Sequence, residues 1–168
     1  RVQIPSYTFK HDFKDGFPAI TTKKLYWKCI VGELLWILRG DTNIKYLVDN
    51  NINIWNKDAH NFFKRRKCYS KGNDLSYESF MKAVPHNNHH AGKIGRGYGA
   101  QLRNWATIHD NPSTGMPELL DQFAELINTL KTNPMATKKT VTFWNPAEKD
   151  ACALTPCHWS FEILVEPL

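Results

Sequence analysis

Two different hydrophobic periodicities occur in this chain, and together they restrict it to folds that contain both helices and strands. Residues 22–39 and 117–131 repeat apolar side chains with the spacing of amphipathic helices. Residues 140–144 and 157–166 alternate apolar and polar side chains at period two, which is typical of strands. The patterns predict an α+β fold in which both helices pack on a mixed sheet that carries both strands.

The helix predicted over residues 22–39 has recognisable boundary signals. Thr21 or Thr22 is expected to cap its start, and Gly40 is expected to end it. Residues 43–50 follow directly, and their apolar side chains fall on one helical face. We therefore expect a second, short helix there.

Two further segments carry turn and helix-start signals. Residues 6–18 alternate apolar and polar side chains and end in Gly16 and Pro18, which predicts a strand closed by a turn. Pro117 suits the first turn of the helix predicted over residues 117–131, because proline lacks the backbone N–H that this turn leaves unpaired.

Residues 57–93 are polar, basic and rich in asparagine and histidine. We expect a surface insertion with short helices, whose apolar anchors are Phe62, Phe63, Phe80 and Val84. A length of 168 residues suits one domain, spanning residues 1–168, with a core of its own. No apolar run reaches the roughly 18 residues of a membrane span, and the start does not read as a signal peptide. We therefore expect a cytoplasmic protein without a membrane partner.

Charge and cysteine usage narrow the functional classes. The formal charge of +6 favours anionic partners without selecting among them. The basic run at 64–67 is typical of a solvated helix face, with nucleic acid or an anionic small molecule as the sharper alternatives. Four cysteines without paired zinc-type spacing indicate a reducing compartment rather than a disulfide framework. His86, His89 and His90 lack a nearby cysteine or carboxylate set, so they predict a solvated loop and no metal.

Cys157 stands between a proline and a histidine at the start of the last predicted strand. It is either a nucleophile or a small apolar residue of a packed sheet, and most buried cysteines are the latter. Neighbours on a strand point to opposite faces, so His158 is not expected to act as a simple base for this thiol. A reactive thiolate here needs stabilising groups from elsewhere in the chain.

Glu33 lies among apolar neighbours on the first predicted helix. The side chains three and four positions away are Cys29, Ile30, Trp36 and Ile37. A carboxylate in this setting is costly unless it is paired or protonated. Two interpretations stay open: a structural ion pair with Lys23, Lys24 or Lys28, and a general acid or base.

The stretch GKIGRGYGAQLRNW, residues 92–105, is rich in glycine. It lacks the Gly-Lys-Ser/Thr sequence and the strand-loop-helix context of a phosphate-binding loop. We interpret it as a turn that lets Tyr98, Gln101 and Arg103 approach a ligand.

Six motifs, in this order and spacing, resemble the thymidylate synthase family. They are GFPAITTKKLYWK, GELLWILRGDTNIKYL, INIW, GYGAQLRNW, LKTNP and FWNPAEKDACALTPCHW, and the last one contains Cys157. The resemblance covers most of the chain outside residues 57–93. It implies a thymidylate synthase-like fold and identifies Cys157 as the nucleophile.

The resemblance also implies a reaction and its partners. The family converts deoxyuridylate (dUMP) to thymidylate (dTMP) by reductive methylation, with 5,10-methylenetetrahydrofolate giving both the carbon and the hydride, without a metal. The family is homodimeric, and nucleic acid is not expected as a partner. The residues that match family positions are Cys157, Glu33, Tyr98 and His158 for catalysis, Lys23, Ile54 and Trp55 for the folate, and Lys138 and Gln101 for the nucleotide.

Several positions depart from the family pattern. Two adjacent arginines that usually reach the nucleotide phosphate across the dimer are replaced by Thr137 and Lys138. Lysine offers a point charge but not the bidentate fork of arginine. Gly32 replaces a usual histidine, Leu102 a usual tryptophan, and Asp58 a second folate-side tryptophan.

The resemblance also suggests that the sequence is incomplete. The leading segment with its phosphate-binding arginine and the C-terminal half with the pyrimidine-reading asparagine are not in the sequence, so we expect residues 1–168 alone to be inactive. Two alternatives remain beside the methyltransferase. One is a deoxypyrimidine hydroxymethylase on the same scaffold, and the other is an inactive truncated remnant with a basic binding surface.

Overall fold

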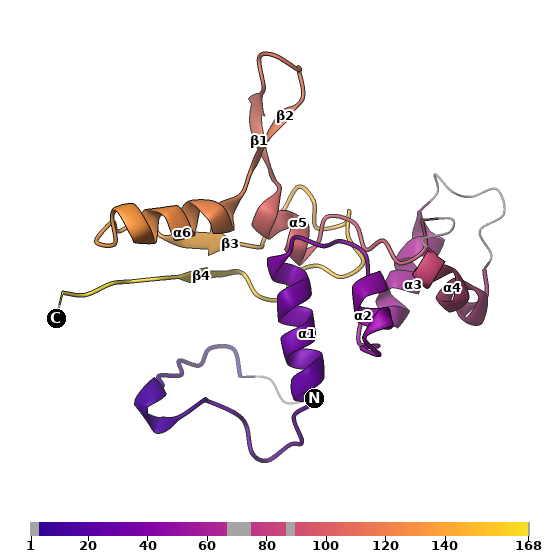
Figure 1. The fold of residues 1–168 in the computed structure, drawn as a ribbon, viewed down its shortest axis with the longest axis horizontal. Helices are drawn as coiled ribbons and strands as arrows, with labels where there is room; N and C mark the ends of the chain where they lie inside the picture. Colours follow the sequence, from indigo (N-terminus) through magenta and orange to yellow (C-terminus); the bar gives the residue numbers. More distant parts are fainter. Residues whose placement is uncertain (1–3, 67–74, 87–89, 168) are drawn as a thin grey trace.

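The structure is a computed structural model that describes residues 4–66, 75–86 and 90–167. Figure 1 shows α6, β3 and β4 at one end, α3 and α4 at the other, and a β1–β2 hairpin that projects from the middle. The predicted α+β class is confirmed. In chain order the elements are η1 (Phe13–Asp15), α1 (Trp27–Leu38), α2 (Lys45–Asp49), α3 (Asn56–Arg65), α4 (Tyr77–Ala83), η3 (Val84–His86), α5 (Tyr98–Arg103), β1 (Trp105–Asp110), β2 (Pro117–Leu120), α6 (Gln122–Thr132), β3 (Thr140–Thr142) and β4 (Ser160–Glu162).

The strands of the described residues form two separate antiparallel pairs rather than the single mixed sheet expected. β1 pairs with β2, with Trp105 opposite Leu120. β3 pairs with β4, with Val141 opposite Phe161. The two strands predicted near the C-terminal end are therefore partners, but each is only three residues long.

Helix α1 is shorter than its apolar pattern predicted. It begins at Trp27 after Tyr26, which makes no side-chain cap hydrogen bond. The expected cap at Thr21 or Thr22 is therefore wrong. The expected end is confirmed, because Gly40 has a φ of 74° just after the last turn, a conformation that glycine adopts without strain.

Helix α6 begins five residues later than predicted. The side chain of Asp121 accepts a hydrogen bond from the backbone N–H of Ala124 at 2.9 Å and caps the helix at that point. Pro117 therefore lies in β2 and not in a first helical turn. The helical pattern was extended too far because Leu119 and Leu120 are also compatible with a strand.

The strand predicted over residues 6–18 is not formed. The described part of this segment is irregular apart from η1, where Asp12 accepts a hydrogen bond from the backbone N–H of Lys14. The side chains of Tyr7 and Phe9 are 79% and 66% exposed. Alternation alone does not make a strand, because a strand needs a partner for its backbone groups.

The main core joins α1, α2, α3, α4 and α5. Trp36, Leu47 and Phe80 are fully buried in it, and Trp55 and Tyr98 are nearly so. The four apolar anchors predicted within residues 57–93 are all buried, so this polar stretch contributes to the core. The assignment of residues 1–168 to one domain with an insertion there stays a prediction.

A second, smaller core forms where α5, α6 and β3 meet. Its buried members are Leu102, Leu126 and Val141. Ile37 and Phe143 pack against both cores, so α1 and the end of β3 are held in the same body of packed side chains. None of the helices in the described ranges is long and apolar enough to cross a bilayer.

Gly95 provides a sharp test of how closely two chain segments pack. Its φ is +76°, and a Cβ at this position would collide with the carbonyl oxygen of Ala151. Gly115 has a φ of +62° but open space around it. We expect Gly115→Ala to lower the free energy of unfolding by about 1–2 kcal/mol, the cost of a left-handed backbone. Gly95→Ala should cost about 3 kcal/mol or more, because the collision adds to that cost.

Urea denaturation of both variants measures the difference between the two glycines. Equal losses of stability would contradict the tight approach of residues 95 and 151.

Candidate active site

The hydroxyl group of Tyr98 connects the two residues of the Cys-His motif. Its Oη accepts a hydrogen bond from the backbone N–H of Cys157 at 2.7 Å and another from the backbone N–H of His158 at 3.3 Å. It also lies 2.9 Å from Nδ1 of the His158 ring. With both backbone groups donating, the phenolic proton is available for Nδ1, which leaves the ring proton of a neutral His158 on Nε2.

The Glu33 carboxylate is held by an indole and not by a lysine. Trp55 Nε1 donates a hydrogen bond to Glu33 Oε1 at 2.7 Å. Among the described residues, no ion pair joins Glu33 to Lys23, Lys24 or Lys28, although all three are described. The ion-pair interpretation of this carboxylate is therefore wrong.

The same tryptophan connects Glu33 to Tyr98. Trp55 is 4% exposed and lies edge-on to the Tyr98 ring, with ring centroids 6.4 Å apart. Its other neighbour is Trp36, at 5.5 Å. Buried aromatic rings with their polar atoms paired are rigid supports. The carboxylate and the phenol are thus fixed relative to one another.

A pocket of about 570 Å³ opens beside this cluster. Glu33, Tyr98 and His158 are its polar ionisable members, and the remaining lining is mainly apolar side chains of α1, α5 and the β3–β4 region, including Leu34, Leu102, Phe143 and Phe161. An apolar cavity of this size with a few convergent polar groups is typical of a small-molecule site.

Cys157 is exposed, and β4 begins three residues after it. The expectation that Cys157 and His158 occupy opposite faces of a strand is therefore wrong, because this part of the chain is irregular. The His158 ring instead turns toward Tyr98. The thiol is accessible, as a nucleophile must be.

Of the three residues expected to bind folate, one contacts Glu33 and Tyr98 and the other two do not. Trp55 belongs to the cluster, and Ile54, next to it, is 48% exposed. Lys23 is exposed in the segment before α1. None of the three is among the residues that line the pocket beside Tyr98.

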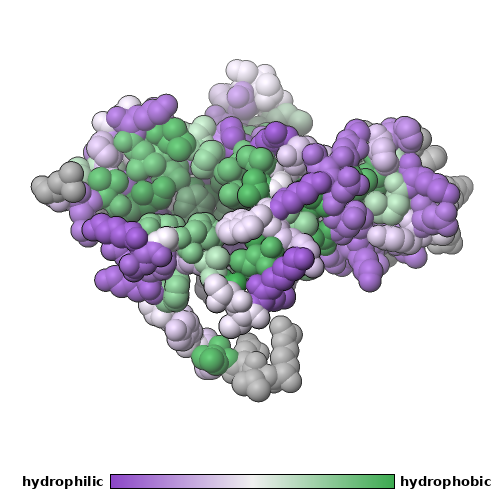
Figure 2. Space-filling view, turned by 60° about the horizontal axis from the view of Figure 1, so that its bottom comes forward, coloured by the Kyte–Doolittle hydropathy of each residue, from purple (hydrophilic) through white to green (hydrophobic). Residues whose placement is uncertain are grey.

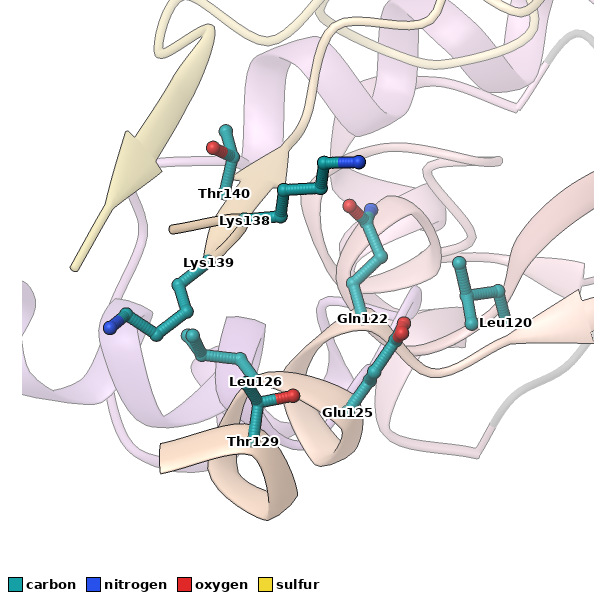
Figure 3. A pocket seen from close by; sticks show the side chains of 8 residues that line it. All are labelled: Leu120, Gln122, Glu125, Leu126, Thr129, Lys138, Lys139 and Thr140. Carbon is teal, nitrogen blue, oxygen red and sulfur yellow. The ribbon is translucent and has the colours of Figure 1, made fainter. Parts of the chain in front are cut away.

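The two residues expected to bind the nucleotide, Gln101 and Lys138, do not line the pocket beside Tyr98. Gln101 is 1% exposed, and its side chain is bonded to other protein groups. Lys138 lines a separate hollow of about 130 Å³ between β3 and α6. Figure 3 shows that Lys138 and Lys139 leave the chain in opposite directions, and Lys139 donates to the carbonyl oxygen of Pro134.

Sequence reasoning missed the polar groups that hold the chain before Cys157. Glu148, Arg96 and Asn145 form hydrogen bonds with one another and with Gln101. Arg96 and Gln101 lie about fifty positions before Asn145 and Glu148 in the sequence, so no local pattern could connect the two pairs. The glycine-rich character of residues 92–105 was the one available signal.

In the described part of the chain, no three histidine, cysteine, aspartate or glutamate side chains lie close enough together to hold a metal ion. His89 and Cys68 lie outside the described residues. Cys152 is buried beside Ile94 and Gly95, and burial raises the pKa of its thiol. This thiol is therefore a poor candidate for a nucleophile.

Thiol labelling separates the two C-terminal cysteines. At pH 8, Cys157 should react rapidly with an aromatic disulfide reagent. Cys152 should react at least about tenfold more slowly, because the reagent must wait for local opening and the thiolate is disfavoured. In a background that carries Cys29→Ser and Cys68→Ser, Cys157→Ser should remove the rapid phase, whereas Cys152→Ser should leave it intact. A rapid phase that survives in Cys157→Ser would contradict this assignment.

Comparison with known proteins identifies the family of this chain. The family model of thymidylate synthase matches residues 1–168. The thymidylate synthases of Mesoplasma florum and Mycoplasma genitalium are each 39% identical, over 93% and 98% of this chain and 50% and 53% of those proteins. That of Listeria monocytogenes is 36% identical over 95% of this chain and 55% of its own length. The chain spans about half the length of these curated relatives. Because the match extends over every residue of the sequence, the chain belongs to the thymidylate synthase family.

Proposed function

We propose that the complete protein is a thymidylate synthase, which methylates dUMP to dTMP with 5,10-methylenetetrahydrofolate in the cytoplasm. The observation that carries this proposal is the Tyr98 hydroxyl, which binds the backbone of Cys157 and the ring of His158 at the edge of a pocket lined by Glu33. The phenol, the imidazole and the carboxylate line one pocket, and the exposed thiol of Cys157 belongs to the residue whose backbone N–H is bonded to that phenol. The complete fold proposed is the mixed sheet of the family, of which β3 and β4 are a part.

Cys157 performs the first step. The C5 carbon of uracil is a poor nucleophile, so it cannot attack a one-carbon unit directly. The thiolate adds to C6, an S–C bond forms, and the electron pair of the C5–C6 double bond moves toward O4 as an enolate. C5 then carries the electron density needed to form the new carbon–carbon bond.

Glu33 and Tyr98 handle the protons. The enolate places negative charge on O4, and a carboxyl group held at a fixed position can pass a proton to it directly or through a water. The Trp55 indole fixes that position. Tyr98 assists removal of the C5 proton, and its bond to His158 Nδ1 gives the phenol a partner for the proton that it exchanges.

The folate supplies the one-carbon unit and the hydride that completes the methyl group. Ile54 offers exposed apolar surface, and Lys23 offers a charge that suits the acidic tail of the folate, whereas Trp55, at 4% exposure, acts on the site through its hydrogen bond to Glu33. The pocket volume of about 570 Å³ lies within the roughly 300–1,000 Å³ of ordinary ligand sites.

The reaction is tested on the product of the complete gene. We expect tritium release from 5-tritiated deoxyuridylate and, in equal amount, oxidation of the folate to dihydrofolate. Cys157→Ser should lower turnover by at least about 10⁴-fold, because no other group can form the covalent bond. Cys29→Ser, a change at a half-buried cysteine of α1, should retain activity.

Two outcomes would contradict the proposal. Tritium release without dihydrofolate would identify a hydroxymethylase, in which water replaces the hydride. Full turnover by Cys157→Ser would place the nucleophile elsewhere.

We also propose that the complete enzyme is a homodimer. Five large apolar side chains of α1 are at least two-fifths exposed: Trp27, Ile30, Val31, Leu34 and Leu35. Figure 2 shows apolar side chains gathered over the half of the molecule that carries α6 and β4, whereas the α3–α4 half is mostly hydrophilic. Monomers rarely leave so much apolar surface in contact with water.

A dimer also gives Lys138 a role. Within one chain this lysine lines a different hollow from Tyr98 and His158, so it cannot be assigned to their pocket. In a two-fold dimer, Lys138 from a second copy can hold the nucleotide phosphate as a point charge.

Subunit complementation tests this arrangement. Lys138→Ala should raise the KM for dUMP roughly tenfold or more, the cost of one charge-assisted hydrogen bond. In a mixture of Cys157→Ser and Lys138→Ala subunits, half of the dimers are hybrids and each hybrid has one intact site. About a quarter of wild-type activity should return at low dUMP. No gain over the unmixed variants would show that Lys138 does not act across a dimer.

A further inference from the structure

The segment that ends in Cys157 is anchored to the segment that begins α5 through one partly buried carboxylate. We propose that Glu148 and Gln101 are positioning residues, which set the distance between Cys157 and Tyr98 without touching substrate. The inference rests on the proposed function, since it assigns the two residues to that same site. It replaces the expectation that Gln101 binds the nucleotide.

Glu148 is the centre of the anchor. Its side chain is 19% exposed and forms an ion pair with Arg96 through Oε1. Its Oε2 accepts hydrogen bonds from Gln101 Nε2 at 2.8 Å and from Asn145 Nδ2 at 3.1 Å. A mostly buried carboxylate that accepts from three donors is held at a fixed position.

Gln101 has no hydrogen-bond donor to spare for a ligand. Its Nε2 donates to the carbonyl oxygen of Arg96 at 2.9 Å as well as to Glu148, and its Oε1 accepts a weak bond from Asn145 at 3.4 Å. Its side chain is 1% exposed. An amide nitrogen has two protons, and both are used within the protein.

Backbone contacts continue the anchor toward the nucleophile. The N–H of Arg96 donates to the carbonyl of Ala151 at 3.3 Å, and the N–H of Ala153 donates to the carbonyl of Ile94 at 2.8 Å. Between these bonds, Gly95 pairs with Cys152 as an isolated bridge. The two segments are therefore joined by side chains at residue 148 and by backbone from residue 151 to 153.

The geometry of the site follows from this junction. Tyr98 lies between Arg96 and Gln101 in sequence, and Cys157 follows Ala153 by four residues. The 2.7 Å bond from the Cys157 N–H to Tyr98 Oη therefore depends on the register in which the two segments meet. A shift of about 1 Å at a reacting group can cost on the order of 10²-fold in rate.

The test is Glu148→Gln in the complete enzyme. The new side chain keeps the size of the old one but removes the charge that pairs with Arg96, and it brings its own amide protons against Gln101 and Asn145. We expect kcat to fall on the order of 10²-fold, with the KM for dUMP within about threefold, since no substrate contact is lost. The matched control is Glu78→Gln, which breaks an exposed pair with Lys82 on α4 and should leave kcat unchanged.

A second readout does not depend on activity. Hydrogen–deuterium exchange reports the Cys157 amide, which should lose at least about tenfold of its protection in Glu148→Gln while the amides of α6 keep theirs. A residue that merely supports the fold would lower protection everywhere in proportion. Should Glu148→Gln fail to fold, Gln101→Met gives the same test, because it keeps the buried volume and removes the bonds to Arg96 and Glu148.

The outcomes separate this inference from the proposed function. A wild-type enzyme without methyltransferase activity overturns the proposed function, whatever the exchange data show. With an active wild type, a kcat for Glu148→Gln within about twofold of normal, or an unchanged Cys157 amide, overturns the positioning role. A rise in KM with kcat unchanged would overturn it as well, since it would make Glu148 a binding residue.

Discussion

The hydroxyl group of Tyr98 is the contact on which the candidate site depends. It binds the backbone of both Cys157 and His158, two residues about sixty positions away in sequence. This contact fixes the position of Cys157 and His158 only if the Tyr98 ring itself cannot move. That condition is met by the aromatic column beneath it, in which Trp36 supports Trp55 and Trp55 supports Tyr98. The indole nitrogens of the column are paired, one with Glu33 and one with the Asn43 carbonyl.

A rigid phenol is useful only when the nucleophile's own segment is equally fixed. That segment has little regular structure between β3 and β4, so its backbone groups must find partners elsewhere. Ala151 and Ala153 find them in Arg96 and Ile94, and Glu148 adds a charged anchor at the start of the segment. Two segments without strong secondary structure thus hold each other in place. Gly95 makes this approach possible, because no other residue leaves room for the Ala151 carbonyl.

Helices, strands and helix ends that depend on neighbouring residues could be predicted from the sequence. Contacts between residues far apart in the chain could not. Local signals predicted α1, α2 and the pairing partners β3 and β4, and Gly40 was recognised as a helix end. The start of α6 was missed, because Leu119 satisfies a helical and a strand pattern equally and the choice was made by pairing with Ala106. For the candidate site, Cys157 and Glu33 were singled out from their sequence neighbours, and the roles that the family resemblance implies for them stay predictions. The roles of Glu148 and Trp36 depend on contacts across the fold, which no local pattern encodes.

Gly32 shows that a departure from the family pattern can be explained by packing within this chain. A Cβ at this position would collide with the side chain of Ile52, which is 2% exposed and fills the space beside α1. The residue that precedes Glu33 therefore has to be small as long as position 52 is large and branched. Exchanging volume between two contacting positions preserves the density of the core. The carboxylate next to Gly32 keeps its bond to Trp55, which belongs to the same core as Ile52.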